Sequence, residues 1–340
     1  MDYKKSGVDI AAGNEAVSRI KSHVKKTFNK NVLAEIGGFG GLFSLDKSEW
    51  DKPVLVSSTD GVGTKLIVAF QAGIYDTVGE DLVNHCVNDI FVQGAKPLFF
   101  LDYIGISKVV PSRIESIIEG MVRGCVANDL ALVGGEMAEM PDIYKEDDFD
   151  LVGTIIGCVE RDKIINGSVI KPNDVIIGYR SSGLHTNGYT LARKVLFEKM
   201  GLRVDSYLDE LGCTVGEALL KVHRSYYGIL KNYAVPEIIH GTAHITGGGI
   251  PGNLSRVIPA DCMAEIYCDK WEVLPIFKLI QRGGDIANEE MYRAFNMGIG
   301  YIVVTDESSA DKLLALDDGA ALIGRIKERK DESNSVEMNY

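Results

Sequence analysis

The segment Asp60-Gly-Val-Gly-Thr-Lys65 places a carboxylate, a hydroxyl and an ammonium around two glycines. It follows the apolar run 53–59, which predicts a buried strand ending at the acid. The glycines allow a tight turn or a close approach of the backbone to a ligand, and the polar groups suit a metal-bound polyphosphate. The spacing is not that of the Gly-x-x-x-x-Gly-Lys-Ser/Thr phosphate loop, so an ordinary turn is the alternative interpretation.

Two further acids could join Asp60 at a divalent cation. Asp89 lies four residues after His85 on one face of a predicted helix 76–93, although a solvated helix face would show the same spacing. Glu136 follows another strand-like run and two glycines. Ligands of α/β proteins gather at strand ends, and carboxylates hold the Mg²⁺ of a triphosphate. We therefore expect Asp60, Asp89 and Glu136 to converge on one metal site.

Two other segments have the composition of anion sites. His185 and Asn187 lie in a run of small residues that leads into a predicted helix, where free N–H groups could bind an anion. Ordinary N-capping would explain the same residues. Thr246 is followed by three glycines that end at Gly249, and such a run can line a nest of backbone N–H groups for a phosphate.

The bulk composition limits the classes of function. The chain has 340 residues, of which 46% are hydrophobic and 25% charged, values typical of a globular protein of about two domains. Its net charge of -12 argues against nucleic acid or an anionic membrane as a partner. No run approaches the roughly 18 apolar residues of a membrane span. Six cysteines without a Cys-x-x-Cys pair and a polar N-terminus favour a cytoplasmic protein.

The order of predicted elements indicates an α+β (mixed α/β) fold of two domains. The polar stretch 160–173 is the candidate boundary, which gives domains at 1–165 and 166–340. In the second domain we expect one helix at 215–232 and a charged, frayed tail after Lys327.

These motifs, in this order, resemble the aminoimidazole ribonucleotide synthetase family, also called phosphoribosylformylglycinamidine cyclo-ligase. The match covers nearly the whole chain, whereas Ser58, Asn84-His85, Met137 and Ala294 depart from the family's usual residues. The other segments that carry the resemblance are Tyr3-Lys-Lys-Ser-Gly-Val-Asp-Ile10, Gly37-Gly-Phe-Gly40, Gly94-Ala-Lys-Pro-Leu-Phe-Phe-Leu-Asp-Tyr103 and Glu290-Met-Tyr-Arg-Ala-Phe-Asn296.

The resemblance implies a homodimer in which strands of two N-terminal domains form a shared barrel. The N-terminal domain would bind ATP, and the C-terminal α/β domain would complete the active site. The implied reaction consumes ATP, with Mg²⁺, to close the imidazole ring of formylglycinamidine ribonucleotide. Its products are aminoimidazole ribonucleotide, ADP and phosphate, formed in purine biosynthesis.

The resemblance also implies roles for individual residues. His185, Asn187 and Lys21 match catalytic positions of the family. Thr246, Gly247, Gly248 and Gly249 match a turn that binds the substrate phosphate. The nucleotide positions are Asp60, Gly61, Gly63, Thr64, Lys65, Asp89, Gly135 and Glu136, of which Asp60, Asp89 and Glu136 are also the metal positions.

Other families of similar pattern fit less well. Selenophosphate synthetase needs a cysteine or selenocysteine in the N-terminal glycine-rich segment, but the first cysteine here is Cys86. The hydrogenase-maturation relative carries a C-terminal cysteine, whereas this chain ends in Tyr340. The related amidotransferase is far longer. Thiamine-monophosphate kinase, which lacks the opening motif, is the enzyme alternative, and a nucleotide-binding regulator without turnover is the alternative from another class.

Overall fold

The computed structural model describes residues 7–145, 148–330 and 334–340, so the opening residues Tyr3–Ser6 of the family-like motif lie outside it. The chain divides into two compact units. Unit 1 comprises Met1–Ile90 and Lys96–Glu160, and unit 2 comprises Phe91–Ala95 and Arg161–Tyr340. The assignment of ATP binding and dimerisation to residues 1–165, and of active-site completion to 166–340, stays a prediction.

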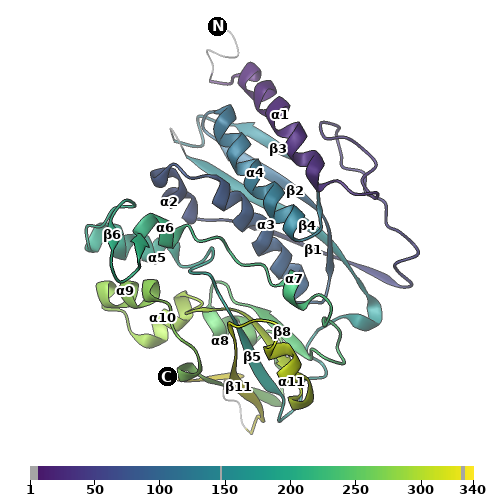
Figure 1. Cartoon of the computed structure of the whole chain (residues 1–340), viewed down its shortest axis with the longest axis vertical. Helices are drawn as coiled ribbons and strands as arrows, with labels where there is room; N and C mark the ends of the chain where they lie inside the picture. The colour runs from purple at the N-terminus through teal and green to yellow at the C-terminus, as the bar shows by residue number, and fades with distance from the viewer. Residues whose placement is uncertain (1–6, 146–147, 331–333) are drawn as a thin grey trace. The chain divides into compact units, whose positions relative to one another are not determined.

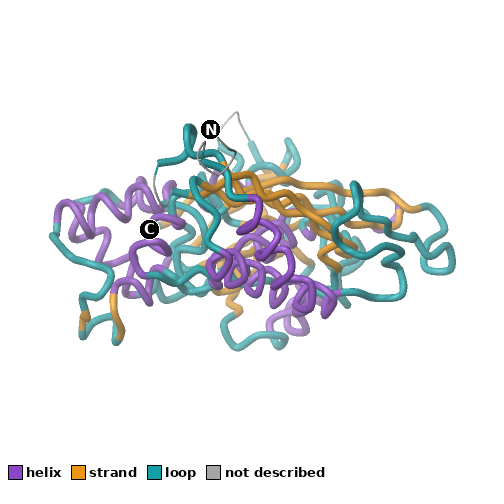
Figure 2. The backbone as a smooth tube through the Cα atoms, turned by 90° about the horizontal axis from the view of Figure 1, so that it is seen from above, coloured by secondary structure: helices purple, strands orange, loops and turns teal. Residues whose placement is uncertain are grey.

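Unit 1 is a four-stranded sheet in the order β1-β4-β2-β3, with helices on one face (Figures 1 and 2). Strand β4 is antiparallel to both β1 and β2, whereas β2 and β3 are parallel. The outer strands of this described sheet are therefore β1 and β3. Its elements are α1 (Ile10–Val24), β1 (Pro53–Gly61), α2 (Lys65–Ala72), α3 (Asp76–Phe91), β2 (Lys96–Ile106), α4 (Pro111–Ala127), β3 (Ala131–Glu139) and β4 (Phe149–Glu160).

Glycines set the position of α3 against α4. A Cβ at Gly79 would lie 2.0 Å from the carbonyl oxygen of Ile117, and one at Gly120 would lie 1.8 Å from that of Asp76. No side chain fits in that space, so the two helices touch backbone to backbone. This close contact fixes the helix that carries His85 and Asp89.

Strand β1 is not the buried strand that its apolar sequence predicts. Its residues alternate between exposed and partly exposed, and Leu55 keeps 65% of its surface accessible. The reason is that β1 is an outer strand whose second face carries no helix. A strand with one open edge and an exposed apolar side chain is a surface that proteins normally cover.

Unit 2 is built on a six-stranded sheet in the order β12-β9-β11-β5-β10-β8. Its pairs are antiparallel, apart from the parallel pair of β12 and β9. The strands of this sheet are β5 (Val175–Arg180), β8 (Gly241–His244), β9 (Cys262–Tyr267), β10 (Ile299–Thr305), β11 (Ala320–Glu328) and β12 (Val336–Asn339). The short strands β6 (Tyr207–Leu208) and β7 (Cys213–Thr214) form a separate pair.

The helices of unit 2 differ from expectation in one place. The single helix expected at 215–232 is two short helices, α6 and α7, separated by a segment that contains His223. The helices are α5 (Tyr189–Arg193), which continues as a π-helical turn over Lys194–Lys199, α6 (Val215–Leu219), α7 (Tyr227–Leu230), α8 (Gly249–Leu254), α9 (Pro275–Gly284), α10 (Asn288–Ala294) and α11 (Glu307–Leu314). The tail expected to fray instead ends in strand β12, paired with β9.

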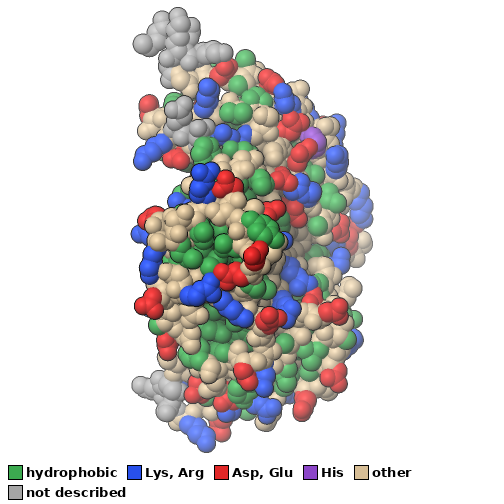
Figure 3. Space-filling model, turned by 60° about the vertical axis from the view of Figure 1, so that its left-hand side comes forward, with side chains coloured by type: hydrophobic (Ala, Val, Ile, Leu, Met, Phe, Trp, Pro, Cys, Tyr) green, Lys and Arg blue, Asp and Glu red, His purple; other side chains and the backbone are tan. Residues whose placement is uncertain are grey.

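The surface view in Figure 3 shows acidic and basic side chains interspersed, without a continuous basic area on that face. All six cysteines are free, and four of them are buried. Among the described residues, no helix combines the length and the apolar character needed to cross a membrane.

Candidate active site

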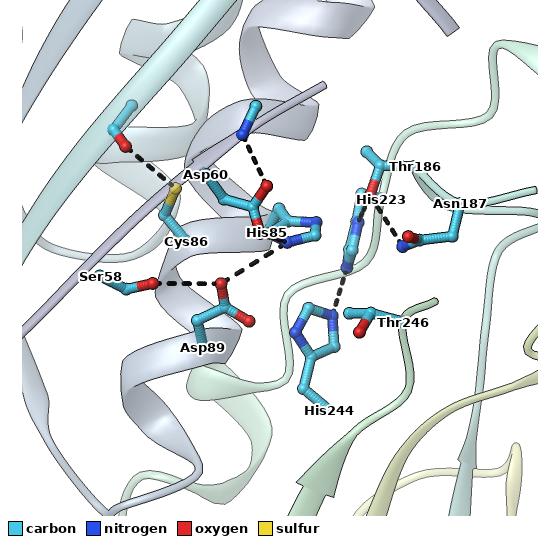
Figure 4. Close-up of polar contacts among 12 residues, drawn as sticks. Ser58, Asp60, His85, Cys86, Asp89, Thr186, Asn187, His223, His244 and Thr246 are labelled. Atoms are coloured by element: carbon cyan, nitrogen blue, oxygen red, sulfur yellow. Dashed lines mark hydrogen bonds and ion pairs between the residues drawn. The ribbon is translucent and has the colours of Figure 1, made fainter. Parts of the chain in front are cut away.

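In unit 1, two acids meet one imidazole. Asp60 lies near the end of β1, and its Oδ2 is 2.8 Å from Nε2 of His85 on α3 (Figure 4). Oδ2 of Asp89, one turn further along α3, lies 3.5 Å from the same nitrogen and accepts a hydrogen bond from Ser58. One ligand atom from each of Asp60, His85 and Asp89 lies within 4.8 Å of the others, so these residues can hold a metal ion.

The electrostatics of this cluster suit a cation. Burial alone lowers the pKa of His85, but its hydrogen bond to Asp60 and the charges of Asp89 and Asp60 outweigh that effect and raise the pKa. The carboxylates of Asp60 and Asp89 thus favour a positive charge beside them, which a proton on His85 or a divalent cation could supply. Sequence analysis placed His85 on the helix face but not among the ligands, although its four-residue spacing from Asp89 was the available signal.

The turn after Asp60 has the expected form, but its lysine points inward. The backbone N–H of Gly61 donates to Oδ1 of Asp60, and Gly63 adopts a φ of 67° before α2 begins. Lys65 is fully buried, with its Nζ 2.7 Å from Oδ2 of Asp81. Burial lowers the pKa of Lys65, and the Asp81 carboxylate opposes this. In this conformation the ammonium faces an internal carboxylate, and its role at the nucleotide stays a prediction.

Within one chain the structure does not bring Glu136 to Asp60 and Asp89, so the metal role of Glu136 stays a prediction. Asp60 on β1 and Gly135 on β3 belong to one row of paired residues, which runs through Gly153 of β4 and Asp102 of β2. Three strand spacings separate β1 from β3, which is roughly 14 Å. Glu136 therefore lies at the opposite edge of the sheet from Asp60. Strand-end motifs do not reveal strand order, so the sequence could not show that β1 and β3 are the two outer strands.

One of the three predicted catalytic residues, Lys21, lies in unit 1 on helix α1. Lys21 is exposed in the last turn of α1, and that helix packs against α4. Its catalytic role therefore stays a prediction.

Unit 2 contains a stack of buried histidines. His185 has a φ of 61°, unusual for a residue with a side chain, and its ring stacks on His223 with centroids 4.0 Å apart. Nε2 of His223 lies 2.9 Å from Nε2 of His244. Nε2 of His185 accepts the backbone N–H of Ser182, so the proton of a neutral His185 ring lies on Nδ1. Sequence analysis missed His223, because it placed this residue inside the single helix expected at 215–232.

The glycine turn of unit 2 is held by one amide. Asn253 Nδ2 lies 3.3 Å, 3.2 Å and 2.8 Å from the carbonyl oxygens of Thr246, Gly247 and Gly249, to which it donates. Its Oδ1 accepts a hydrogen bond from Oγ1 of Thr246. These carbonyls therefore face Asn253, and the role of the turn at a phosphate stays a prediction. Asn253 lies in α8, which begins at Gly249, and sequence analysis did not single it out.

The two predicted anion segments of unit 2 meet. A Cβ built at Gly247 would lie 3.4 Å from Oδ1 of Asn187, which places that side chain against the turn (Figure 4). Gly248 and Gly249 have φ values of 95° and 62°, which strongly favour glycine. A Cβ at Gly249 would lie 1.8 Å from the carbonyl oxygen of Tyr292, so glycine is also needed there for packing.

Known proteins match both units. Residues 48–159 match the family model described as AIR synthase related protein, N-terminal domain, and residues 171–337 match the corresponding C-terminal domain. Among solved structures, the thiamine-monophosphate kinase of Stenotrophomonas maltophilia has a TM-score of 0.67 at 17% identity and covers 96% of each chain. The hydrogenase maturation protein HypE in complex with ATP has a TM-score of 0.65 at 18% identity, covering 95% of this chain and 91% of that one. At these identities the likeness concerns the fold alone.

Curated relatives are much closer. The phosphoribosylformylglycinamidine cyclo-ligase of Syntrophotalea carbinolica is 50% identical over 336 residues, covering 98% of this chain and 96% of its own. The enzyme of the same name from Brevibacillus brevis is 47% identical over 341 residues, covering 98% and 99%. The resemblance drawn from the motifs is therefore confirmed: this chain belongs to the phosphoribosylformylglycinamidine cyclo-ligase family.

Proposed function

We propose that this chain closes the imidazole ring of formylglycinamidine ribonucleotide in an ATP-dependent reaction of purine biosynthesis. The products are aminoimidazole ribonucleotide, ADP and phosphate. The observation that carries this function is 50% identity to a named cyclo-ligase over nearly the whole length of both chains. The two kinds of site described above, one suited to a cation and one to an anion, agree with the reactants.

The reaction needs an activated oxygen and a positioned nitrogen. The formyl amide oxygen of the substrate is a poor leaving group, and transfer of the γ-phosphoryl group of ATP to it makes a good one. The amidine nitrogen then attacks the same carbon, the carbon–oxygen bond breaks, and phosphate leaves. Such transfers depend on positioning and on stabilising the charge that develops, which metal ions and N–H donors supply.

In our proposal, Asp60 and Asp89 hold the Mg²⁺ that accompanies ATP, and Mg²⁺ supplies charge neutralisation at the phosphates. Their geometry around His85 fits that role, since hard oxygen ligands are what Mg²⁺ prefers. Gly61, Gly63 and Thr64 form the adjoining turn at the nucleotide.

We assign the substrate phosphate to the turn Thr246–Gly249 in unit 2. Asn187 then lies beside that phosphate, because its Oδ1 is 3.4 Å from a Cβ built at Gly247. The conformation of His185 is fixed by its stacking on His223 and by the N–H of Ser182, as expected of a positioned catalytic side chain.

We further propose a homodimer. Strands β1 and β3 are the outer strands of the described sheet in unit 1, and Leu55 is exposed on β1. If β3 of one copy adjoins β1 of a second copy, Glu136 and Gly135 come beside the second copy's counterpart of Asp60. The three acids would then converge across the pair, although they do not converge within one chain. We place this enzyme in the cytoplasm, with small molecules and a second copy of itself as its partners.

The deciding experiment measures ADP release by the purified protein with ATP, Mg²⁺ and candidate substrates. We expect release that depends strictly on formylglycinamidine ribonucleotide. Turnover that instead requires thiamine monophosphate would support the kinase alternative. Nucleotide binding without turnover of either substrate would support a regulator, and both results would refute the proposal.

A further inference from the structure

The segment 221–226 of unit 2, between α6 and α7, is bonded to the end of β5. Nη1 of Arg224 lies 3.2 Å from the carbonyl oxygen of Arg180, the last residue of β5, and donates to it. The hydroxyl group of Tyr226 donates to the same carbonyl oxygen at 2.9 Å. This segment, which carries His223, is therefore held where the loop that follows β5 begins.

His223 is fully buried, and its contacts join two parts of the predicted site (Figure 4). Its ring stacks on that of His185 with an angle of 22° between the ring planes. At one edge of the ring, Nδ1 lies 3.3 Å from Oγ1 of Thr186, and at the other, Nε2 lies 2.9 Å from Nε2 of His244. His244 is the last residue of β8, two positions before Thr246. One ring thus connects the loop after β5 with the strand that leads into the glycine turn.

These hydrogen bonds form a continuous chain. Two ring nitrogens 2.9 Å apart share a single proton, so when both rings are neutral one carries its proton on Nε2 and the other on Nδ1. If His223 carries the Nε2 proton, its Nδ1 accepts the hydroxyl proton of Thr186. If His244 carries it, Nδ1 of His223 donates to Thr186 instead. The hydroxyl group of Thr186 is bonded to His223 in either direction.

The chain continues from Thr186 to Asn187. Nδ2 of Asn187 lies 3.4 Å from Oγ1 of Thr186 and donates to it. The side-chain amide is planar, so a hydrogen bond at Nδ2 also sets the direction of Oδ1. That oxygen lies 3.4 Å from a Cβ built at Gly247, and it is the atom of Asn187 directed at the glycine turn.

We propose that His223 is a positioning residue of the substrate site. Through Thr186 it orients the amide of Asn187 beside the glycine turn, and through His244 it ties this loop to the strand that leads into the same turn. The inference rests on the proposed function, which places the phosphate of the ribonucleotide at that turn. His223 itself touches no reactant in this proposal.

The first test separates the hydrogen bonds of His223 from its stacking. His223→Phe keeps an aromatic ring against His185 but removes both hydrogen bonds, and Thr186→Val removes only the hydroxyl group. Because a misplacement of about 1 Å can cost roughly 100-fold, we expect each variant to raise the KM for the ribonucleotide by about tenfold, with the KM for ATP unchanged. The double variant should lose no more than the larger single loss, since both changes break one chain. Losses that multiply, or equal rises in both KM values, would overturn the proposal.

His240→Phe is the matched control. His240 is also a buried histidine of unit 2, and its Nδ1 lies 2.6 Å from Oδ2 of Asp174, outside the chain described above. We expect this variant to lose stability but to keep both KM values. A rise in the KM for the ribonucleotide as large as that of His223→Phe would show a general effect of replacing a buried histidine and would refute the proposal.

Two amide variants test the direction of the effect, also if His223→Phe fails to fold. The amide of His223→Asn can replace Nδ1 toward Thr186, whereas the amide of His223→Gln can replace Nε2 toward His244. We expect His223→Asn to keep the lower KM for the ribonucleotide. The opposite order would refute transmission through Thr186.

Nitrogen NMR of the imidazole rings gives a test that needs no turnover. In the wild-type protein we expect His223 and His244 to be opposite tautomers, one with its proton on Nε2 and the other with its proton on Nδ1. The same tautomer in both rings would refute the shared proton and, with it, the chain.

Binding of ribose 5-phosphate distinguishes failure of this inference from failure of the proposed function. If the wild type closes the ring, and both His223→Phe and Thr186→Val keep the wild-type KM for the ribonucleotide, the function stands and His223 has no positioning role. If the wild type shows no ring closure but binds ribose 5-phosphate, and both variants weaken that binding, the positioning role stands and the function fails.

Discussion

The candidate sites of the two units are built from different chemical groups. Unit 1 gathers ionisable side chains, with Asp60 half-exposed and His85 almost fully buried between two carboxylates. Unit 2 gathers imidazoles, amides and backbone groups around a glycine turn, and its anchor, Asn253, carries no charge. The first arrangement favours a cation and the second an anion. The contrast suggests that metal–nucleotide binding and substrate phosphate binding can be disabled separately.

The largest expected effect comes from removing charge in unit 1. Asp60→Asn keeps the size and an acceptor for His85 but removes a negative charge. Loss of even an indirect metal partner costs roughly 10–100-fold, so we expect at least that loss in kcat/KM, with partial rescue by added Mg²⁺. Because the Asp60 side chain is 48% exposed, the free energy of unfolding should change by less than about 1 kcal/mol. The measurement is steady-state kinetics over a range of Mg²⁺ concentrations.

The control for that variant is Asp46→Asn, whose carboxylate pairs with Lys30 in the same unit. It should leave the Mg²⁺ dependence unchanged. If Asp60→Asn unfolds the protein while its folded fraction keeps full activity, Asp60 has a structural role. Unit 1 would then not hold a metal ion through Asp60, as the comparison of the two units requires.

In unit 2 the largest effect should come from an uncharged residue. Asn253→Ala leaves the carbonyls of the glycine turn without their donor, and an unsatisfied buried group costs about 1–3 kcal/mol. We expect a loss of that size in the free energy of unfolding, measured with urea, together with a higher KM for the ribonucleotide. Asn166→Ala, at an exposed asparagine bonded only locally to Ser168, is the matched control. Equal stability of the two variants would show that the turn does not depend on Asn253.

A smaller change probes the turn without straining it. Gly247 has no positive φ, and a Cβ there would meet Oδ1 of Asn187 at 3.4 Å. Gly247→Ala should raise the KM for the ribonucleotide several-fold through crowding, with ATP affinity retained. Gly248→Val would confuse the test, because φ is 95° at that position. Gly228→Ala, with nothing within 4 Å of its added carbon, is the control. If the affinity for ATP falls instead, the turn binds a phosphate of ATP, and our assignment of the substrate phosphate to it is wrong.

The smallest effect is a pH dependence confined to unit 1. The pKa of His85 is raised in the folded protein, so its stabilising contribution is fully present below the unfolded value of about 6.5. That contribution is lost as pH rises through the higher folded pKa. The difference in unfolding free energy between wild type and His85→Gln should therefore shrink as pH rises above about 6.5. Saturating Mg²⁺ should remove the dependence, because the cation takes the place of the proton. A difference that is flat with pH would exclude a charged His85.

Local sequence patterns predicted local structure well. The acid and glycines after β1 form the turn into α2, and the four-residue spacing of His85 and Asp89 places both on one side of α3. The mixed α/β class and the family also follow from such patterns. These features depend on residues close together in sequence, where turn chemistry and helical periodicity act directly.

What could not be predicted depends on strand order and on distant contacts. Glu136 follows the same strand-and-glycine pattern as Asp60, yet β3 and β1 lie at opposite edges of the sheet. His223 stacks on a residue 38 positions earlier, a contact that no local pattern indicates. Strand β12 is short, and it pairs with β9, a segment far from it in sequence.

The open edges of the sheet in unit 1 have a consequence for how the protein behaves during synthesis. If the proposed homodimer forms, a newly folded copy exposes the outer strands β1 and β3 of the described sheet, and the side chain of Leu55, until a second copy pairs with it. Its lifetime in that state depends on the amount of chain present, because pairing is a bimolecular step. The midpoint of thermal unfolding should therefore rise with protein concentration. Edge-to-edge aggregation of such copies would compete with this pairing during refolding.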